Sequence, residues 1–193
     1  MKKTEDAVLD VAKSKFDRFG FKKTTVDEIA KEARISKRTI YGHFKNKEDL
    51  FVSLFMREAL TARKHLLKTL ASIEDPLEKI RAYFMFTQEY FQKHPFMLKI
   101  LQDNKGLYAP FLKKKYIANV ETGILDIISG ILKEGMRKKE FRPLNPLIIA
   151  YIIFKLFQAF TYAKTIPLTD REKDAQEEII ELIEFITEGI KNK

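Results

Sequence analysis

The chain has 193 residues, with 36 lysines and arginines against 27 aspartates and glutamates, and its formal net charge is +9. It contains no cysteine, which excludes disulfide bonds, thiol catalysis and cysteine-based metal sites. Three histidines lie far apart in the sequence, so we expect no metal ion. The 45% of hydrophobic residues can fill a core, and the length suits one large domain or two small ones.

The composition favours helices over strands. Only seven glycines and six prolines are present, and leucine, isoleucine, phenylalanine, lysine and glutamate are abundant. The sequence therefore predicts an all-α fold with few turns. Acidic residues interrupt the apolar ones at the N-terminus, so we expect no secretory signal and a cytoplasmic location.

The first third of the chain predicts three short helices and the start of a long one. Residues 3–19 carry apolar side chains at helical spacing. Thr25 begins a Thr-x-x-Glu capping box, which indicates the start of a second helix. Ser36 caps a third helix, and Asn46 caps a fourth that reaches about residue 70.

Five further helices are predicted after that point, most of them set off by prolines or glycines. They cover residues 77–93, 96–102, 111–138, 147–163 and 171–190. The helix at 147–163 is apolar all round, with Lys155 and Gln158 near its middle. A bilayer needs about 20 apolar residues, so we expect this helix in a core or an oligomer interface. The apolar character of this helix and of the last helix, residues 171–190, together predict a self-association surface.

Residues 25–44 have the layout of a helix-turn-helix. Between Arg34 and Lys47 the chain carries five basic residues and no acidic one. DNA affinity comes first from basic groups that displace counterions from phosphates, and sequence is read by a helix in the major groove. The groups that suit this chemistry are the side chains of Lys37, Arg38, Thr39, Tyr41, His43 and Lys47, with Gly42 allowing close approach of the backbone.

The run from residue 16 to residue 51 reads FxxFGFKKTTVDEIAKEARISKRTIYGHFKNKEDLF. It resembles the DNA-binding signature of the TetR family of bacterial regulators, and the resemblance covers about residues 5–55. The rest of the chain has no motif of its own, but its length and helical layout are similar to the family's second domain. The resemblance implies about nine helices, in a helix-turn-helix DNA-binding domain (1–50) and a ligand-binding and dimerisation domain (51–193).

The resemblance also assigns roles by position. The third predicted helix corresponds to the family's recognition helix, and its residues Lys37, Arg38, Thr39, Tyr41, Gly42 and His43 match positions that meet the major groove. Tyr41, His43 and Lys47 match positions that commonly bind phosphate. Thr25 matches the start of the second helix, where a hydroxyl and a backbone N–H also meet phosphate. Arg34 stands where the family usually has glycine; a left-handed conformation there costs roughly 1 kcal/mol, and its side chain adds a candidate phosphate contact. The candidate DNA-binding residues are Thr25, Arg34, Lys37, Arg38, Thr39, Tyr41, Gly42, His43 and Lys47.

The second domain is rich in aromatic side chains. A helical core can absorb each of them singly, but as a group they suit a cavity for an apolar ligand. The resemblance implies an inducer pocket among the middle helices. The candidates are Tyr83, Phe86, Tyr90, Tyr108, Tyr116, Phe154 and Gln158. Because no tight acidic cluster occurs among them, we expect a bulky hydrophobic effector rather than a cation.

Together these observations predict a homodimeric transcriptional regulator. We expect a repressor that a hydrophobic small molecule releases from a palindromic operator, with the dimer formed by the last two helices. We expect no cofactor and no enzyme activity, since no catalytic constellation is present. Three alternatives stay open: activation instead of repression, an architectural DNA-binding protein without a ligand, and a basic helical protein that acts at a membrane surface or on a protein partner.

Overall fold

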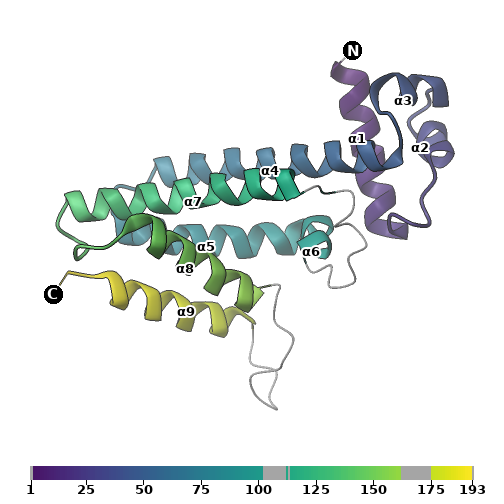
Figure 1. Ribbon diagram of the computed structural model, residues 1–193. Coiled ribbons are helices and arrows are strands. Elements are labelled where there is room, and N and C mark those ends of the chain that lie inside the picture. Colours follow the sequence, from purple (N-terminus) through teal and green to yellow (C-terminus); the bar gives the residue numbers. More distant parts are fainter. Residues whose placement is uncertain (1, 102–111, 113, 162–174, 193) are drawn as a thin grey trace. The chain divides into compact units, whose positions relative to one another are not determined.

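The computed structural model describes the chain except for residues 1, 102–111, 113, 162–174 and 193. The described residues form nine helices and no β-strand, which confirms the predicted all-α fold (Figure 1). In chain order the helices are α1 (Lys2–Phe19), α2 (Val26–Glu32), α3 (Lys37–His43), α4 (Lys47–Ala71), α5 (Pro76–Lys93), α6 (Pro95–Leu101), α7 (Lys114–Arg137), α8 (Pro146–Thr161) and α9 (Ala175–Ile190).

The chain divides into two compact units. The first unit consists of Met1–Thr61 and His94–Tyr116, and the second of Ala62–Lys93 and Ile117–Lys193. α4 therefore begins in the first unit and ends in the second, while α6 belongs to the first unit and α5 to the second.

Local capping explains the helix boundaries of the first unit. Gly20 adopts a left-handed φ of 79° after α1, and its N–H donates to the Phe16 carbonyl at 3.0 Å. At the start of α2 the Thr25 hydroxyl accepts from the Glu28 N–H, while the Glu28 carboxylate accepts from the Thr25 N–H at 2.8 Å. The predicted capping box is therefore present. Ser36 caps α3 by accepting from the Thr39 N–H at 3.0 Å, as its position predicts.

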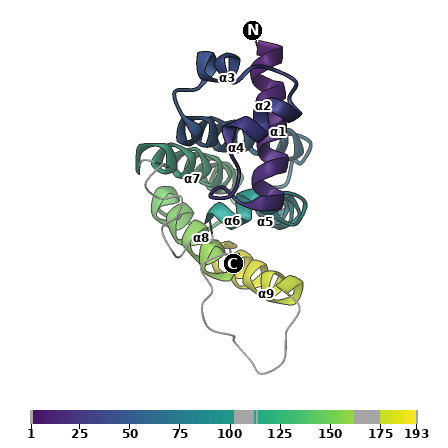
Figure 2. The same ribbon diagram turned by 90° about the vertical axis from the view of Figure 1, so that its right-hand side faces the viewer.

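The core of the first unit is partly aromatic. α1 packs against α2, α3 and α6, and Figure 2 shows α2 and α3 beside α1. Phe16 and Phe21 contact Phe51 of α4 edge-on or nearly so, with the Phe21 and Phe51 ring centroids 5.0 Å apart. Phe96 of α6 adds a fourth ring, 5.6 Å from Phe51 and stacked on Phe16 at 6.4 Å. This aromatic cluster joins α1, α4 and α6 within the unit.

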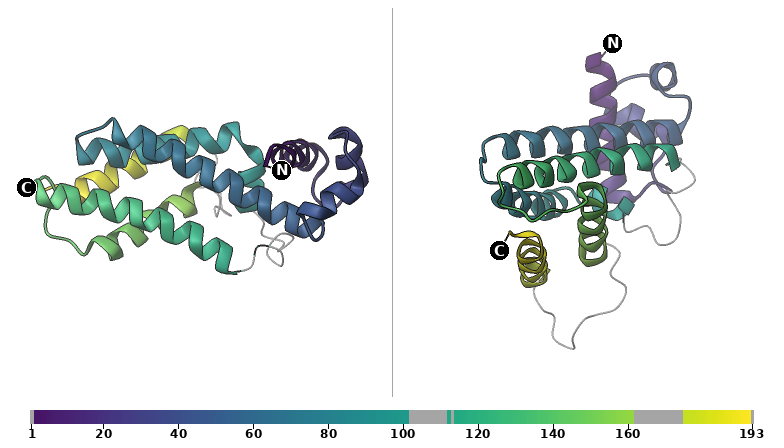
Figure 3. Two further views of the ribbon diagram at one scale, coloured as in Figure 1. Left: turned by 90° about the horizontal axis from the view of Figure 1, so that it is seen from above. Right: turned by 60° about the vertical axis from the view of Figure 1, so that its left-hand side comes forward.

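The second unit has its own core, built from the end of α4 and from α5, α7, α8 and α9. α9 packs against both α5 and α8, and the two panels of Figure 3 show α8 and α9 as neighbours. Tyr83 and Phe84 of α5 meet Phe157 of α8, and all three side chains are buried. α8 also buries Ala150 and Ile153, so it lies in a core, one of the two placements that the sequence predicts. Within the described part of the chain, no helix is both long and apolar enough to cross a bilayer.

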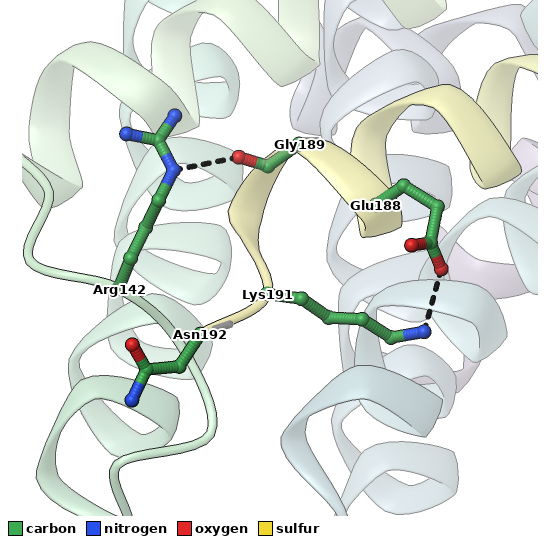
Figure 4. Close-up of a pocket in the computed structure, with 5 residues that line it drawn as sticks. All are labelled: Arg142, Glu188, Gly189, Lys191 and Asn192. Carbon is green, nitrogen blue, oxygen red and sulfur yellow. Dashed lines mark hydrogen bonds and ion pairs between the residues drawn. The ribbon is translucent and has the colours of Figure 1, made fainter.

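The end of the described chain is tied to the connection between α7 and α8. The Arg142 N–H donates to the Ile190 carbonyl at 3.0 Å, and the Asn192 N–H donates to the Glu140 carbonyl at 2.8 Å. Arg142 also donates from Nε to the Gly189 carbonyl at 2.8 Å (Figure 4). An open pocket of about 500 Å³ lies here, lined by Arg142, Glu188, Gly189, Lys191 and Asn192. Two of the bonds between its lining residues, Arg142 to Gly189 and Lys191 to Glu188, hold the end of α9 in place.

Candidate DNA-binding surface

α2 and α3 form the predicted helix-turn-helix, and the turn between them has an unusual residue. Arg34 is exposed and adopts a left-handed φ of 55°. The Ile35 N–H donates to the Ala30 carbonyl at 3.1 Å, and the Arg34 N–H donates to the Lys31 carbonyl at 3.3 Å. This turn is the kind that glycine favours after a helix, so Arg34 keeps the glycine geometry at a cost of about 1 kcal/mol.

α3 presents a polar face while its other face anchors it. Ile40 is buried, and Phe44 directly after the helix is buried as well. On the opposite face Lys37, Arg38, Tyr41 and Gly42 are exposed. Thr39 and His43 are half-buried, and the Thr39 hydroxyl lies 2.8 Å from that of Ser36. The fold thus brings all six candidate residues of α3 onto one seven-residue helix with an accessible side.

Lys37 is paired within the protein. Its ammonium lies 2.9 Å from each carboxylate oxygen of Asp27 on α2. The hydrogen bond and the charge of Asp27 raise the pKa of Lys37, and Tyr41 adds to the effect. Lys37 therefore has to exchange this carboxylate for a base edge or phosphate if it is to contact DNA.

Lys47, the first residue of α4, is also engaged within the first unit. Its ammonium donates to the Phe21 carbonyl at 2.9 Å and to the Thr24 carbonyl at 3.0 Å. It also lies 4.3 Å from the centroid of the Phe21 ring. The phosphate contact expected of Lys47 stays a prediction. The sequence carried no signal for these carbonyl contacts, because their partners lie 23 to 26 residues away.

Five of the seven expected ligand residues have described side chains, and these five form two groups within the second unit. Tyr83 and Phe154 lie in its buried core, and Phe86 packs against that core. Tyr90 is buried and stacks on Phe86 with ring centroids 5.9 Å apart. Gln158 lies in a separate polar group. Of the two remaining candidates, Tyr108 and the side chain of Tyr116 lie outside the described residues.

The polar group around Gln158 joins α7 to α8. The Gln158 side-chain oxygen accepts from the Lys155 ammonium at 2.8 Å, and its amide nitrogen donates to Glu121 at 3.4 Å. Lys155 lies 3.6 Å from Glu121 and 5.2 Å from the Phe154 ring centroid. Sequence reasoning named Gln158 and Phe154 but missed Glu121, whose position on α7 gives no sign that it meets α8.

The outer faces of α8 and α9 carry exposed apolar side chains. We call them the α8–α9 apolar face, which consists of Leu147, Ile148, Tyr151, Ile152, Ile180 and Phe185. Phe185 is the most exposed of them, at 73%. Large exposed apolar side chains on neighbouring helices are typical of a surface that another molecule covers.

Comparison with known proteins identifies the family of the chain. Residues 8–54 match the family described as bacterial regulatory proteins, tetR family, and residues 76–184 match the tetracyclin repressor-like C-terminal domain. The chain belongs to the tetR family. The prediction from the motif in residues 16–51 is thereby confirmed.

Relatives and solved structures agree with this assignment. The HTH-type transcriptional regulator YhgD of Bacillus subtilis is 30% identical, over 86% of this chain and 87% of that protein. The fatty acid metabolism regulator protein of the same species is 26% identical, over 96% and 95%. The crystal structure of the regulator FadR from Bacillus subtilis with stearoyl-CoA has the same fold, with a TM-score of 0.75, 22% identity and coverage of 95% and 98%.

Membership of the family settles the general function. The protein is a ligand-responsive, DNA-binding transcriptional regulator of the tetR family. α2 and α3 carry the helix-turn-helix. The stretch that matches the family's C-terminal domain lies in the second unit except for residues 94–116, which belong to the first unit.

Proposed function

We propose that the protein is a homodimeric repressor that leaves its operator when a long-chain fatty acyl compound binds to the second unit. The observation that carries this proposal is the match to a fatty acid metabolism regulator along 96% of the chain. The same fold holds stearoyl-CoA in the FadR structure. As a regulator of bacterial genes, the protein would act in the cytoplasm, where the chromosome lies.

The side chains expected to line the ligand site suit an acyl chain. Tyr83, Phe86, Tyr90 and Phe154 offer aromatic surface at or beside the core of the second unit. Apolar lining with few polar groups is the usual character of a site for a hydrophobic ligand. Gln158, held between charged neighbours, would meet the polar end of the ligand.

Two copies of the helix-turn-helix would read the operator. In this account Arg38, Thr39, Tyr41, Gly42 and His43 meet base edges or phosphates in the major groove. Thr25, Arg34 and Lys37 complete the set of candidate direct contacts. Lys47, the ninth candidate, supports this surface from the start of α4. Two helix-turn-helix domains related by a two-fold axis would fit half-sites about 34 Å apart, so the operator would be a near-palindrome. Residues 1–50 would carry this activity, and residues 51–193 the ligand response and dimerisation.

The α8–α9 apolar face supports a dimer through the last two helices. Its six apolar side chains lie on neighbouring helices of one unit. A two-fold interface uses the same surface on both subunits, so the same two helices of a second copy would complete a four-helix contact. Ligand binding would then release DNA only through a difference in ligand affinity between the DNA-bound and free conformations.

A DNA-release assay tests the proposal. The full-length protein is bound to a duplex that it has itself selected from a random library, and binding is followed by fluorescence anisotropy. Stearoyl-CoA should release the duplex at concentrations where coenzyme A and acetyl-CoA do not. Release by none of the three, with DNA binding intact, would reject a fatty acyl effector and leave the DNA-binding function in place.

A further inference from the structure

Lys47 holds the connection between α1 and α2. Its ammonium donates to the carbonyls of Phe21 and Thr24, the first and the fourth residue after Gly20. The ring of Phe21 faces the same ammonium. Phe21 is itself fixed in the aromatic cluster, and Thr24 is 1% exposed. One side chain of α4 therefore satisfies two carbonyls of a connection far away in sequence.

The second of these carbonyls, that of Thr24, directly precedes Thr25, the N-cap of α2. Thr24 donates its hydroxyl to the Gly20 carbonyl at 2.9 Å, and the next residue, Thr25, forms the capping box with Glu28. The position of the Thr24 carbonyl therefore determines where the backbone enters α2. A lysine that fixes this carbonyl also fixes the N-terminus of α2, and with it Thr25.

Moving Lys47 to a phosphate would disrupt this arrangement. Two partly buried carbonyls would lose a charged donor, and such hydrogen bonds contribute more than neutral ones. The contact with the Phe21 ring would be lost as well. If the Lys47 side chain stays where it is, it keeps these interactions and supports DNA binding indirectly, through the start of α2.

We propose that Lys47 is a positioning residue, which promotes DNA binding by fixing the Phe21–Thr24 connection and the start of α2 rather than by neutralising a phosphate. A phosphate contact and a positioning role make different predictions for salt dependence. Each phosphate contact that is lost lowers the magnitude of the salt slope by about 0.9. Loss of a positioning contact lowers affinity at every salt concentration and leaves the slope unchanged.

The test compares substitutions in the full-length protein on the selected duplex. Lys47→Met keeps the length of the side chain but removes the ammonium. Lys47→Gln removes the charge but keeps two N–H donors. Lys45→Met removes one charge two residues away, where the side chain is exposed. Dissociation constants are measured at salt concentrations from about 50 to about 300 mM, because the salt dependence of affinity in this range reports the number of phosphate contacts.

We expect Lys47→Met to weaken binding by about tenfold or more relative to Lys45→Met, with the salt slope of the unchanged protein. Lys47→Gln should recover part of this loss, because its amide can still donate to a carbonyl. A slope lower by about 1.8 in both Lys47 variants, which is about 0.9 for each of the two copies in the dimer, with equal loss of affinity, would overturn the proposal. Unchanged affinity in Lys47→Met would overturn it too.

A spectroscopic measurement separates positioning from a general loss of stability. Hydrogen bonds from Thr25 hold the pKa of Glu28 below its usual value. If Lys47 fixes the start of α2, the pKa of Glu28 should rise toward its usual value in folded Lys47→Met and stay low in Lys45→Met. The pKa of Glu28 in each variant is measured by NMR titration of its carboxyl carbon. Should Lys47→Met fail to fold, Lys47→Gln serves instead, and an unmoved Glu28 pKa in the folded variant would contradict the proposal.

Discussion

Asp27 on α2 holds Lys37 on α3 through both of its carboxylate oxygens, each 2.9 Å from the lysine ammonium. The pair places a negative charge beside the first residue of the recognition helix. Both side chains are largely exposed, so the pair contributes little to stability. Its larger effect should be on DNA, since the carboxylate repels phosphate and competes for Lys37.

Removing this carboxylate should strengthen non-specific binding. We expect Asp27→Asn to raise affinity for a random duplex about three- to tenfold at low salt, because one repulsive charge is lost and Lys37 is released. Anisotropy titration with random and selected duplexes measures the change. Glu32→Gln is the matched control, as this acid pairs with Lys15 at the other end of α2. Equal effects of the two substitutions would show that Asp27 has no special role.

The left-handed Arg34 should be replaceable by glycine with a gain in stability. We expect Arg34→Gly to raise the free energy of unfolding by up to about 1 kcal/mol, because glycine adopts φ 55° without strain. Urea unfolding measures this. Lys139 has a φ of 61° in the second unit, and Lys139→Gly provides the control for strain relief alone. If Arg34 meets phosphate, only Arg34→Gly should weaken DNA binding; a loss of stability in both variants would refute the strain argument.

Gly135 on α7 lies against the ring of Phe141. A Cβ at this position would lie 2.1 Å from a ring carbon, closer than any real contact. Gly135→Ala should therefore lower the free energy of unfolding by about 1–3 kcal/mol through overpacking. Gly130→Ala on the same helix meets no atom within 4 Å and should be neutral or stabilising. Thermal unfolding followed by circular dichroism compares them, and similar behaviour of the two variants would contradict this packing.

Asp17 on α1 provides a test of pH dependence. Burial raises the pKa of Asp17, and Glu58 adds to this, whereas Lys99, Lys13 and His94 act in the opposite direction. An acid whose pKa is higher in the folded state stabilises the fold at low pH, and this contribution is lost as pH rises through the folded pKa. Asp17→Asn should thus be more stable than the unchanged protein at pH 7, and the difference should vanish below the usual aspartate range.

The pH experiment uses the difference between the two proteins at each pH, so that other titrating groups cancel. Free energies of unfolding in urea at pH 7 and at about pH 2.8 give this difference. One oxygen of Asp17 is buried without a hydrogen-bond partner among the described residues, which gives the substitution its physical basis. A constant advantage at both pH values would show that the effect is not electrostatic.

Phe185 tests the proposed dimer. We expect Phe185→Glu to shift the protein from dimer to monomer at micromolar concentration, because a charge would have to be buried in an apolar contact. Analytical ultracentrifugation measures the distribution. Leu60→Glu is the control, since Leu60 is exposed at 62% and belongs to α4 rather than to α8 or α9. A dimer that survives Phe185→Glu would place the interface elsewhere.

Local sequence signals predicted much of the fold. The capping residues Thr25 and Ser36 and the left-handed Gly20 act within four residues, so their patterns are visible in the chain itself. The predicted helix starts at residues 77 and 96 differ by one residue from Pro76 and Pro95. The long helix predicted from residue 111 begins at Lys114, and part of that difference lies outside the described residues.

Contacts between distant residues could not be predicted in the same way. Periodicity shows which face of a helix is apolar but not which neighbour covers it. Phe96, for example, lies 80 residues from Phe16 and stacks on it. In the same way the basic character of Lys37 and Lys47 suggested DNA, while their partners Asp27 and Phe21 became known only from the folded chain.

The most direct test of the account is an equilibrium DNA-binding titration of the full-length protein. It compares the DNA upstream of the protein's own gene with a random duplex of equal length, at low and at near-physiological salt. The account predicts tight binding to the upstream DNA that persists at higher salt, and weak, salt-sensitive binding to the random duplex. Equal binding to both that disappears with salt, repeated with duplexes selected from a random library, would contradict a sequence-specific regulator.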